Sequence, residues 1–194
     1  MGKGTGDLYI KAFSADRIIQ SETYGVEDCS NYDSMTSNSG KWTIPSACST
    51  AYDSNGAKFG TATSYSQVKL TEKLTAPCSV EFTLVDYHSD WNDSASVIIF
   101  QYTGGDSTPN QNILSGGFYT KSSFDTLGTT VSHALIKGAK YKIEYGSSTM
   151  KLYENGTLRA SASNTVGLPT KFELHVGTGG NRWVKIKDVK VKPL

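Results

Sequence analysis

Residues 150–161 read MKLYENGTLRAS, and the pair Asn155-Gly156 divides this stretch into two short runs of alternating apolar and polar residues. Asn and Gly both tolerate a positive φ, so the pair favours a type I′ turn, whose twist matches that of paired strands. The stretch therefore predicts a β-hairpin in which Leu152 faces a core, while Lys151 and Arg159 face solvent.

Similar short runs that are typical of β-strands occur over most of the chain. Residues 79–87 (SVEFTLVDY) place Val80, Phe82 and Leu84 on one face, and residues 96–102 (SVIIFQY) form a continuous apolar run typical of a strand covered on both sides. Short strands separated by Gly, Asn, Ser, Asp and Pro clusters indicate an all-β sandwich or barrel. The other segments that we expect to be strands are 8–13, 113–120, 132–136, 140–145, 150–154, 157–161, 171–176 and 182–191.

The length of 194 residues suits one folded domain, preceded by a short lead. We expect residues 1–22 to form an N-terminal arm or edge strand, which pairs with a sheet edge or with a partner subunit. Residues 23–194 then form the sandwich. Within that domain, residues 22–60 read as long connections that cross the sandwich, with Trp42 as a core anchor.

The charge and hydropathy patterns exclude several classes of partner. A net charge of +1 and a sequence pI of about 7.7 give no strong field for nucleic acid or an anionic membrane. The alternating lysines between Lys185 and Lys192 read as the solvated face of a strand. No apolar stretch approaches the ~20 residues that a membrane span needs.

Composition and the N-terminal residues suggest a location. The first ten residues, MGKGTGDLYI, contain no apolar core of a signal peptide, while Ser, Thr and Gly are frequent, as in extracellular and virion β-proteins. We therefore expect an extracellular, cell-surface or virion location. The three cysteines exclude a fully paired disulfide framework, and a Cys29–Cys48 bridge and buried thiols both stay open.

Residues 139–191 resemble the end of concanavalin A-like, laminin-G-like jelly-roll domains of the lectin and glucanase superfamily. Leu152, Tyr153 and Asn155-Gly156 match a hairpin of the form Leu-Tyr-x-Asn-Gly, and a strand ending in a Gly-rich turn and a closing strand follow. The remaining matching positions are Leu174, Val176, Gly177, Ile186, Asp188, Val189 and Val191. The resemblance implies two stacked antiparallel sheets, one of them curved. It also implies glycan binding on the concave face or at loop tips, sometimes with calcium, and some relatives are glycoside hydrolases or polysaccharide lyases.

The carboxylates give no sign of glycosidase chemistry. A retaining glycosidase needs two carboxylates about 5 Å apart, and jelly-roll glucanases supply them from one strand as Glu-x-Asp-x-x-Glu, a motif that this chain lacks. The nearest approach is Glu81 and Asp86, whose spacing puts them on opposite faces of a regular strand. Lyase chemistry uses a Tyr or His base beside an Arg. His133 and Tyr119 would meet at such a site only if they lay on neighbouring strands. We instead interpret His133 as an ordinary histidine of a sheet.

The densest polar segment is VDYHSDWNDSAS, residues 85–96. Its oxygen-bearing residues Asp86, Asp90 and Asp93 suit Ca²⁺, although Asp and Asn are also common turn formers. We expect no other cofactor.

The same segment contains the rings best suited to a sugar. Trp91 and Tyr87 offer flat apolar faces, and Asn92 offers a bidentate amide, so we predict these three as ligand contacts. Trp42 and Trp183 are expected in the core instead. The secondary ligand-binding candidates, on strands of the curved sheet, are Gln101, Tyr102 and Tyr119.

Together these patterns predict a non-catalytic carbohydrate-binding module of a surface, secreted or virion-attachment protein, with a polysaccharide or cell-surface glycan as its ligand. The alternative is a structural, decoration or tail-fibre module of a virion that binds partner subunits through its N-terminal arm. A polysaccharide hydrolase or lyase is the third hypothesis.

Overall fold

A computed structural model describes most of the chain, and every described element is a β-strand. The description covers residues 31–61, 66–71, 74, 77–88, 97–103, 111–116, 124–164, 170–176 and 182–194. No helix long and apolar enough to span a membrane occurs within these residues. The expected N-terminal arm, residues 1–22, lies outside them, as does Cys29, so the arm and the Cys29–Cys48 bridge stay predictions.

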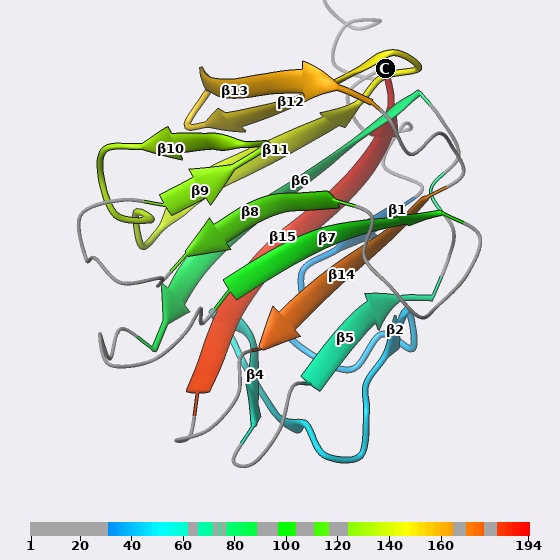
Figure 1. Cartoon of the computed structure of the whole chain (residues 1–194). Helices are drawn as coiled ribbons and strands as arrows, with labels where there is room; N and C mark the ends of the chain where they lie inside the picture. Colours follow the sequence, from blue (N-terminus) through cyan, green and yellow to red (C-terminus); the bar gives the residue numbers. More distant parts are fainter. Residues whose placement is uncertain are drawn as a thin grey trace, which may run out of the picture.

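The strands form two antiparallel sheets stacked face to face, which confirms the predicted sandwich (Figure 1). Sheet A has the order β13-β12-β11-β6-β15-β4-β3, with β1 beside β15. Its strands are β1 (Asn31–Asp33), β3 (Ser49–Asp53), β4 (Gly56–Thr61), β6 (Cys78–Tyr87), β11 (Ala139–Tyr145), β12 (Thr149–Glu154), β13 (Thr157–Ser163) and β15 (Arg182–Pro193).

Sheet B has the order β10-β9-β8-β7-β14-β5-β2. Its strands are β2 (Trp42–Thr43), β5 (Ser66–Leu70), β7 (Val97–Thr103), β8 (Gln111–Gly116), β9 (Phe124–Thr126), β10 (Thr129–Val131) and β14 (Thr170–Val176). Consecutive strands pair at the sheet edges, as in β11-β12-β13 and β7-β8-β9-β10, whereas central pairs such as β15 with β6 and β4 are distant in sequence. The register of each sheet therefore depends on long-range pairing.

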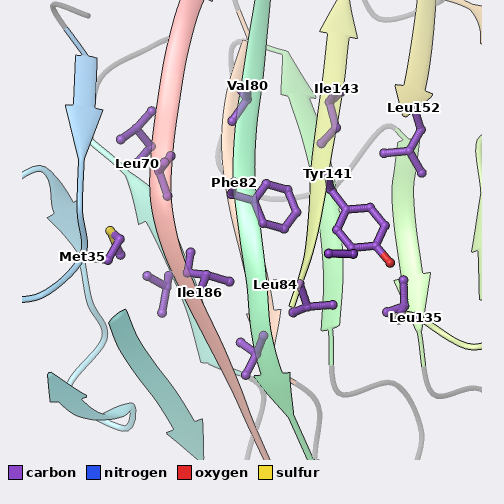
Figure 2. Packing of buried hydrophobic residues seen from close by; sticks show 14 of the residues in the cluster. Met35, Leu70, Val80, Phe82, Leu84, Leu135, Tyr141, Ile143, Leu152 and Ile186 are labelled. Atoms are coloured by element: carbon purple, nitrogen blue, oxygen red, sulfur yellow. The ribbon is translucent and has the colours of Figure 1, made fainter. Parts of the chain in front are cut away.

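The core lies between the sheets and follows the two-residue alternation of the strands. Val80, Phe82 and Leu84 on β6 are fully buried, and Tyr141 and Ile143 on the neighbouring strand β11 lie beside them (Figure 2). The rings of Phe82 and Tyr141 stack with centroids 5.8 Å apart. The alternation in the sequence thus fixes which face of β6 is covered.

The Asn155-Gly156 hairpin is confirmed. Asn155 and Gly156 have φ angles of 49° and 81°, and they join β12 to β13 as a tight turn. Leu152 is buried as predicted. Arg159 does not simply face solvent, however, because it forms an ion pair with Glu154, the last residue of β12.

Three other expectations need correction. Residues 132–136 are a loop between β10 and β11, because the backbone turns at once and the amide of His133 donates to the carbonyl of Val131. Trp183 lies on the outer face of sheet A, with Lys58 over its ring, whereas Trp42 is buried as expected. Residues 49–61 form the β3–β4 hairpin at the edge of sheet A and not an irregular crossing.

Candidate functional site

Four polar side chains meet at one end of the sandwich around the carboxylate of Glu154. His133 Nε2 and Arg159 Nε lie 2.8 and 3.0 Å from Glu154 Oε1, and the Tyr141 hydroxyl donates to Oε2 at 2.8 Å. A terminal nitrogen of Arg159 also lies 2.9 Å from Oε1. We call Glu154, His133, Tyr141 and Arg159 the Glu154 cluster.

Three residues of sheet A and one residue of a loop that follows sheet B build this cluster. Glu154 follows Met150 and Leu152 on the inner face of β12, and its register partner on β11 is Tyr141. A register irregularity between β12 and β13 after Leu152, together with the Asn155-Gly156 turn, brings Arg159 back beside Glu154. His133 comes from the loop after β10, a strand of the other sheet. The carboxylate therefore links sheet A to the end of sheet B.

Glu154 is buried, yet it carries a negative charge. Its burial by itself raises the pKa, but hydrogen bonds from Tyr141, His133 and Arg159 and the charge of His133 outweigh that effect and hold the pKa below its usual range. Burial and the nearby Glu154 raise the pKa of Tyr141, so its phenol stays a donor. Since an ionised carboxylate only accepts hydrogen bonds, His133 donates its Nε2 hydrogen to Glu154.

His133 and Arg159 are partly exposed to solvent, whereas the carboxylate of Glu154 that they contact is buried. The side chain of Glu154 is 0% exposed, whereas those of His133 and Arg159 are 35% and 31% exposed. Glu154 is therefore too enclosed to attack a substrate itself. It is well placed to orient the imidazole of His133 and to stabilise that ring when the ring takes up a proton.

The loop beside the cluster is fixed by contacts with sheet A. The amide of Ile136 donates to the Tyr141 hydroxyl at 3.1 Å, and the Tyr87 hydroxyl donates to the carbonyl of Leu135 at 2.8 Å. Lys137 forms an ion pair with Asp86 at 2.6 Å. The position of His133 is thus held by its neighbours along the loop as well as by Glu154.

Two of the residues predicted from residues 85–96 lie close to this loop. Tyr87 is half-buried, and burial raises its pKa, so its hydroxyl is committed to Leu135. Burial tends to raise the pKa of Asp86, but hydrogen bonds from Lys137 and the Tyr87 amide, with the charge of Lys137, hold it below its usual range. Across the described ranges, no three metal-ligating side chains gather.

The other predicted site residues lie on sheet B or outside the described residues. Gln101 and Tyr102 belong to β7, in the middle of sheet B, where they pair with Phe172 and Lys171 of β14. The glycan contacts and the calcium site stay predictions. The predicted residues outside the described ranges are Trp91, Asn92, Tyr119, Asp90 and Asp93.

Sequence reasoning missed most of the Glu154 cluster. It assigned Arg159 to solvent and His133 to an ordinary sheet strand, and it did not consider Glu154 at all. One local signal was available, since Glu154 continues the inward-facing series that begins with Met150 and Leu152. A carboxylate at such a position must find donors, and this requirement marks it for attention.

Similar architectures occur in solved structures, although no family model and no curated protein matches the sequence. A Bacillus subtilis protein of unknown function with a galectin-like fold aligns with a TM-score of 0.64 and 10% identity, over 84% of this chain and 95% of that chain. The fold is a concanavalin A-like jelly roll.

Several of the similar structures are named as polysaccharide enzymes. The κ-carrageenase of Pseudoalteromonas carrageenovora aligns with a TM-score of 0.63 and 9% identity, over 82% of this chain and 92% of that chain. The β-glucanase of Bacillus licheniformis aligns with a TM-score of 0.56 and 14% identity, over 83% and 96% of the two chains. These jelly-roll neighbours contradict the prediction of a non-catalytic binding module and the prediction that the protein is not an enzyme.

Replacing Glu154 with glutamine should lower the free energy of unfolding by about 1–3 kcal/mol at pH 7, because three donors lose a charged acceptor. The folded-state pKa of Glu154 lies below its unfolded value. The carboxylate's contribution is therefore fully present above the unfolded pKa, and it is lost as pH falls through the folded pKa. Urea unfolding of both proteins at pH 7 and pH 3 measures this difference.

Glu144→Gln is the matched control for that experiment. Glu144 lies on the outer face of sheet A, where Lys142 contacts it at 2.7 Å, and its side chain is 18% exposed. Its removal should cost at most about 1 kcal/mol, because solvent screens such pairs. Equal losses for the two variants, or a Glu154→Gln loss that persists undiminished at pH 3, would contradict an ionised, buried Glu154.

Proposed function

We propose that this protein is an enzyme that cleaves a polysaccharide outside the cell. The concanavalin A-like sandwich supports this, since it is shared with proteins named as a carrageenase, a glucanase and a transglycosylase. The observation that carries the proposal is the contact between His133 Nε2 and Glu154 Oε1, because a partly exposed imidazole held by a buried carboxylate is a typical general base.

The cluster suits β-elimination on a sugar that carries a carboxylate. Arg159 would contact the acidic group of the sugar and reduce its charge, and the Nδ1 side of His133 would remove the proton from the adjacent carbon. The released electron pair forms a carbon–carbon double bond as the glycosidic C–O bond breaks, and the departing oxygen takes a proton from water. The Glu154 carboxylate would stabilise the imidazolium that forms.

The test is an assay of the full chain on alginate, pectate, carrageenan, a mixed-linkage glucan and xylan. Two products are followed, namely new reducing ends and the ultraviolet absorbance of an unsaturated uronate. We expect both signals together on a uronate polymer. Reducing ends without the absorbance would contradict elimination at His133, and no reducing ends on any polymer would contradict the enzyme itself.

Calcium belongs to the same experiment, since the loop that holds Asp90 and Asp93 is still a proposed calcium site. The assay is therefore repeated after treatment with a chelator, followed by addition of CaCl₂. Loss of activity with the chelator and its return with calcium supports the site. Activity that does not respond to the chelator contradicts it.

A further inference from the structure

Lysines cover the outer face of sheet A, the face turned away from sheet B. They occur on four strands, β4, β15, β11 and β12, and β15 alone supplies half of them. The central strand β6 lies between β15 and β11 (Figure 1), so these lysines share one side of sheet A. We define the lysine face as Lys58, Lys140, Lys142, Lys151, Lys185, Lys187, Lys190 and Lys192.

The lysine face carries an excess of positive charge that the whole chain does not. Its eight lysines stand among five carboxylates, which leaves three positive charges in excess, whereas the net charge of the chain is +1. Lys185 pairs with Asp53, and Lys142 pairs with Glu144. The carboxylates of this face are Asp53, Glu81, Asp86, Glu144 and Asp188, and the last of these accepts a hydrogen bond from the Tyr32 hydroxyl.

Five of the eight lysines form no ion pair with a carboxylate of the described residues. They are Lys58, Lys140, Lys187, Lys190 and Lys192. Lys187 has only the neutral side-chain oxygen of Asn55, at 3.3 Å. A surface with several uncompensated cations in fixed positions attracts a ligand that carries several negative charges.

Aromatic rings lie among the lysines on the same face. Lys58 Nζ is 4.2 Å from the ring centroid of Trp183, and Lys142 Nζ is 4.4 Å from that of Tyr153. Lys190 Nζ lies 5.4 Å from the ring of Tyr32. Each pair places an apolar ring next to an ammonium group, which is the combination that a sugar ring with an acidic substituent requires.

We propose that the lysine face binds a linear polysaccharide that carries carboxylate or sulfate groups. Strand geometry spaces its side chains by about 6.6 Å along a strand and about 4.8 Å between strands, so the cations form an open grid that suits a polymer better than a small molecule. This binding is separate from the proposed cleavage, because the Glu154 cluster lies at the inner face of the same sheet.

The carboxylates on the face favour a polysaccharide over a nucleic acid. DNA carries one negative charge per about 1.7 Å of its axis, so close contact would bring phosphates against Glu81 and Glu144. An acidic polysaccharide has fewer charges, and its hydroxyl groups can donate to those same carboxylates. Glu81 lies opposite Lys142 and Lys190 in the register, in the middle of the face.

Affinity electrophoresis of the full chain in gels that contain alginate, dextran sulfate or neutral dextran tests the proposal. We expect alginate and dextran sulfate to retard the protein, less so as salt rises, and neutral dextran to have no effect. The double variant Lys140→Gln/Lys187→Gln should bind more weakly, with a dissociation constant from the retardation that is about 5- to 20-fold higher, since two cation contacts are lost. Glu81→Gln should strengthen binding.

The matched control is Lys140→Arg with Lys187→Arg, which keeps both charges and should bind like the wild type. Thermal unfolding of each variant confirms that the fold is intact, and cleavage assays separate this proposal from the enzymatic one. Unchanged binding by the glutamine variant overturns the proposal, as does equal retardation by neutral dextran. Tighter binding to a DNA duplex at the same charge concentration also overturns it.

Discussion

Replacing His133 with alanine should reduce the rate of polysaccharide cleavage by about 100- to 10,000-fold, the range that general bases contribute. Of the two partly exposed side chains of the Glu154 cluster, the imidazole of His133 is the one whose residue type serves as a general base. Substrate binding should change much less, since Arg159 remains in place. Initial rates of product formation over a range of substrate concentrations separate kcat from KM and so measure both effects.

His88→Ala is the control for that experiment, because the amide of His88 donates to the carbonyl of Trp183 on β15, a strand that does not pair with β12. It should leave the rate near that of the wild type. In contrast, Glu154→Gln should lower kcat, since the imidazole loses the carboxylate that orients it. A His133→Ala enzyme that cleaves as fast as the wild type would remove this residue from the mechanism.

Replacing Phe82 with alanine should lower the free energy of unfolding by about 3–5 kcal/mol, the largest stability change that we expect from one substitution. Phe82 is 0% exposed on β6, and its ring stacks on Tyr141 (Figure 2). Truncation would leave a cavity between the sheets and would deprive Tyr141 of packing on the side next to the Glu154 cluster. Urea denaturation followed by tryptophan fluorescence measures the change.

Thr83→Ala provides the comparison, because Thr83 is the next residue on β6 and lies on the opposite, outer face. Its substitution should change the unfolding free energy by less than about 0.5 kcal/mol. A Phe82→Ala loss below about 1 kcal/mol would mean that the two sheets close around the vacancy, and the packing described for this core would then be wrong.

Local sequence signals predicted the fold well, because a strand's alternation and a turn's backbone requirement are both contained in adjacent residues. Asn155 and Gly156 adopt the positive φ angles that their residue types favour, and Val80, Phe82 and Leu84 are buried as their spacing indicated. The loop at residues 132–136 was mistaken for a strand, since His133 and Leu135 mimic the alternation. The backbone bond from His133 to Val131 ends that pattern at once.

The Glu154 cluster could not be predicted in the same way, because it depends on contacts between separate strands. Tyr141 and His133 reach Glu154 from β11 and from the other sheet, and sequence spacing gives neither the register nor the sheet order. Sequence alone shows a catalytic motif readily only where its residues lie on one strand, as in Glu-x-Asp-x-x-Glu. The absence of that motif favoured the prediction that the protein is not an enzyme, which the similar solved structures contradict.

Because one carboxylate anchors both sheets and also orients His133, activity and stability share a single contact. Any mutation that alters the charge of Glu154 is expected to change the melting temperature together with the rate, so laboratory evolution should rarely accept changes there. Variation in specificity has more freedom at Arg159, which is partly exposed and can be exchanged without emptying the interior. Selection for a new substrate would therefore change the exposed position of this site first and leave the buried Glu154 unchanged.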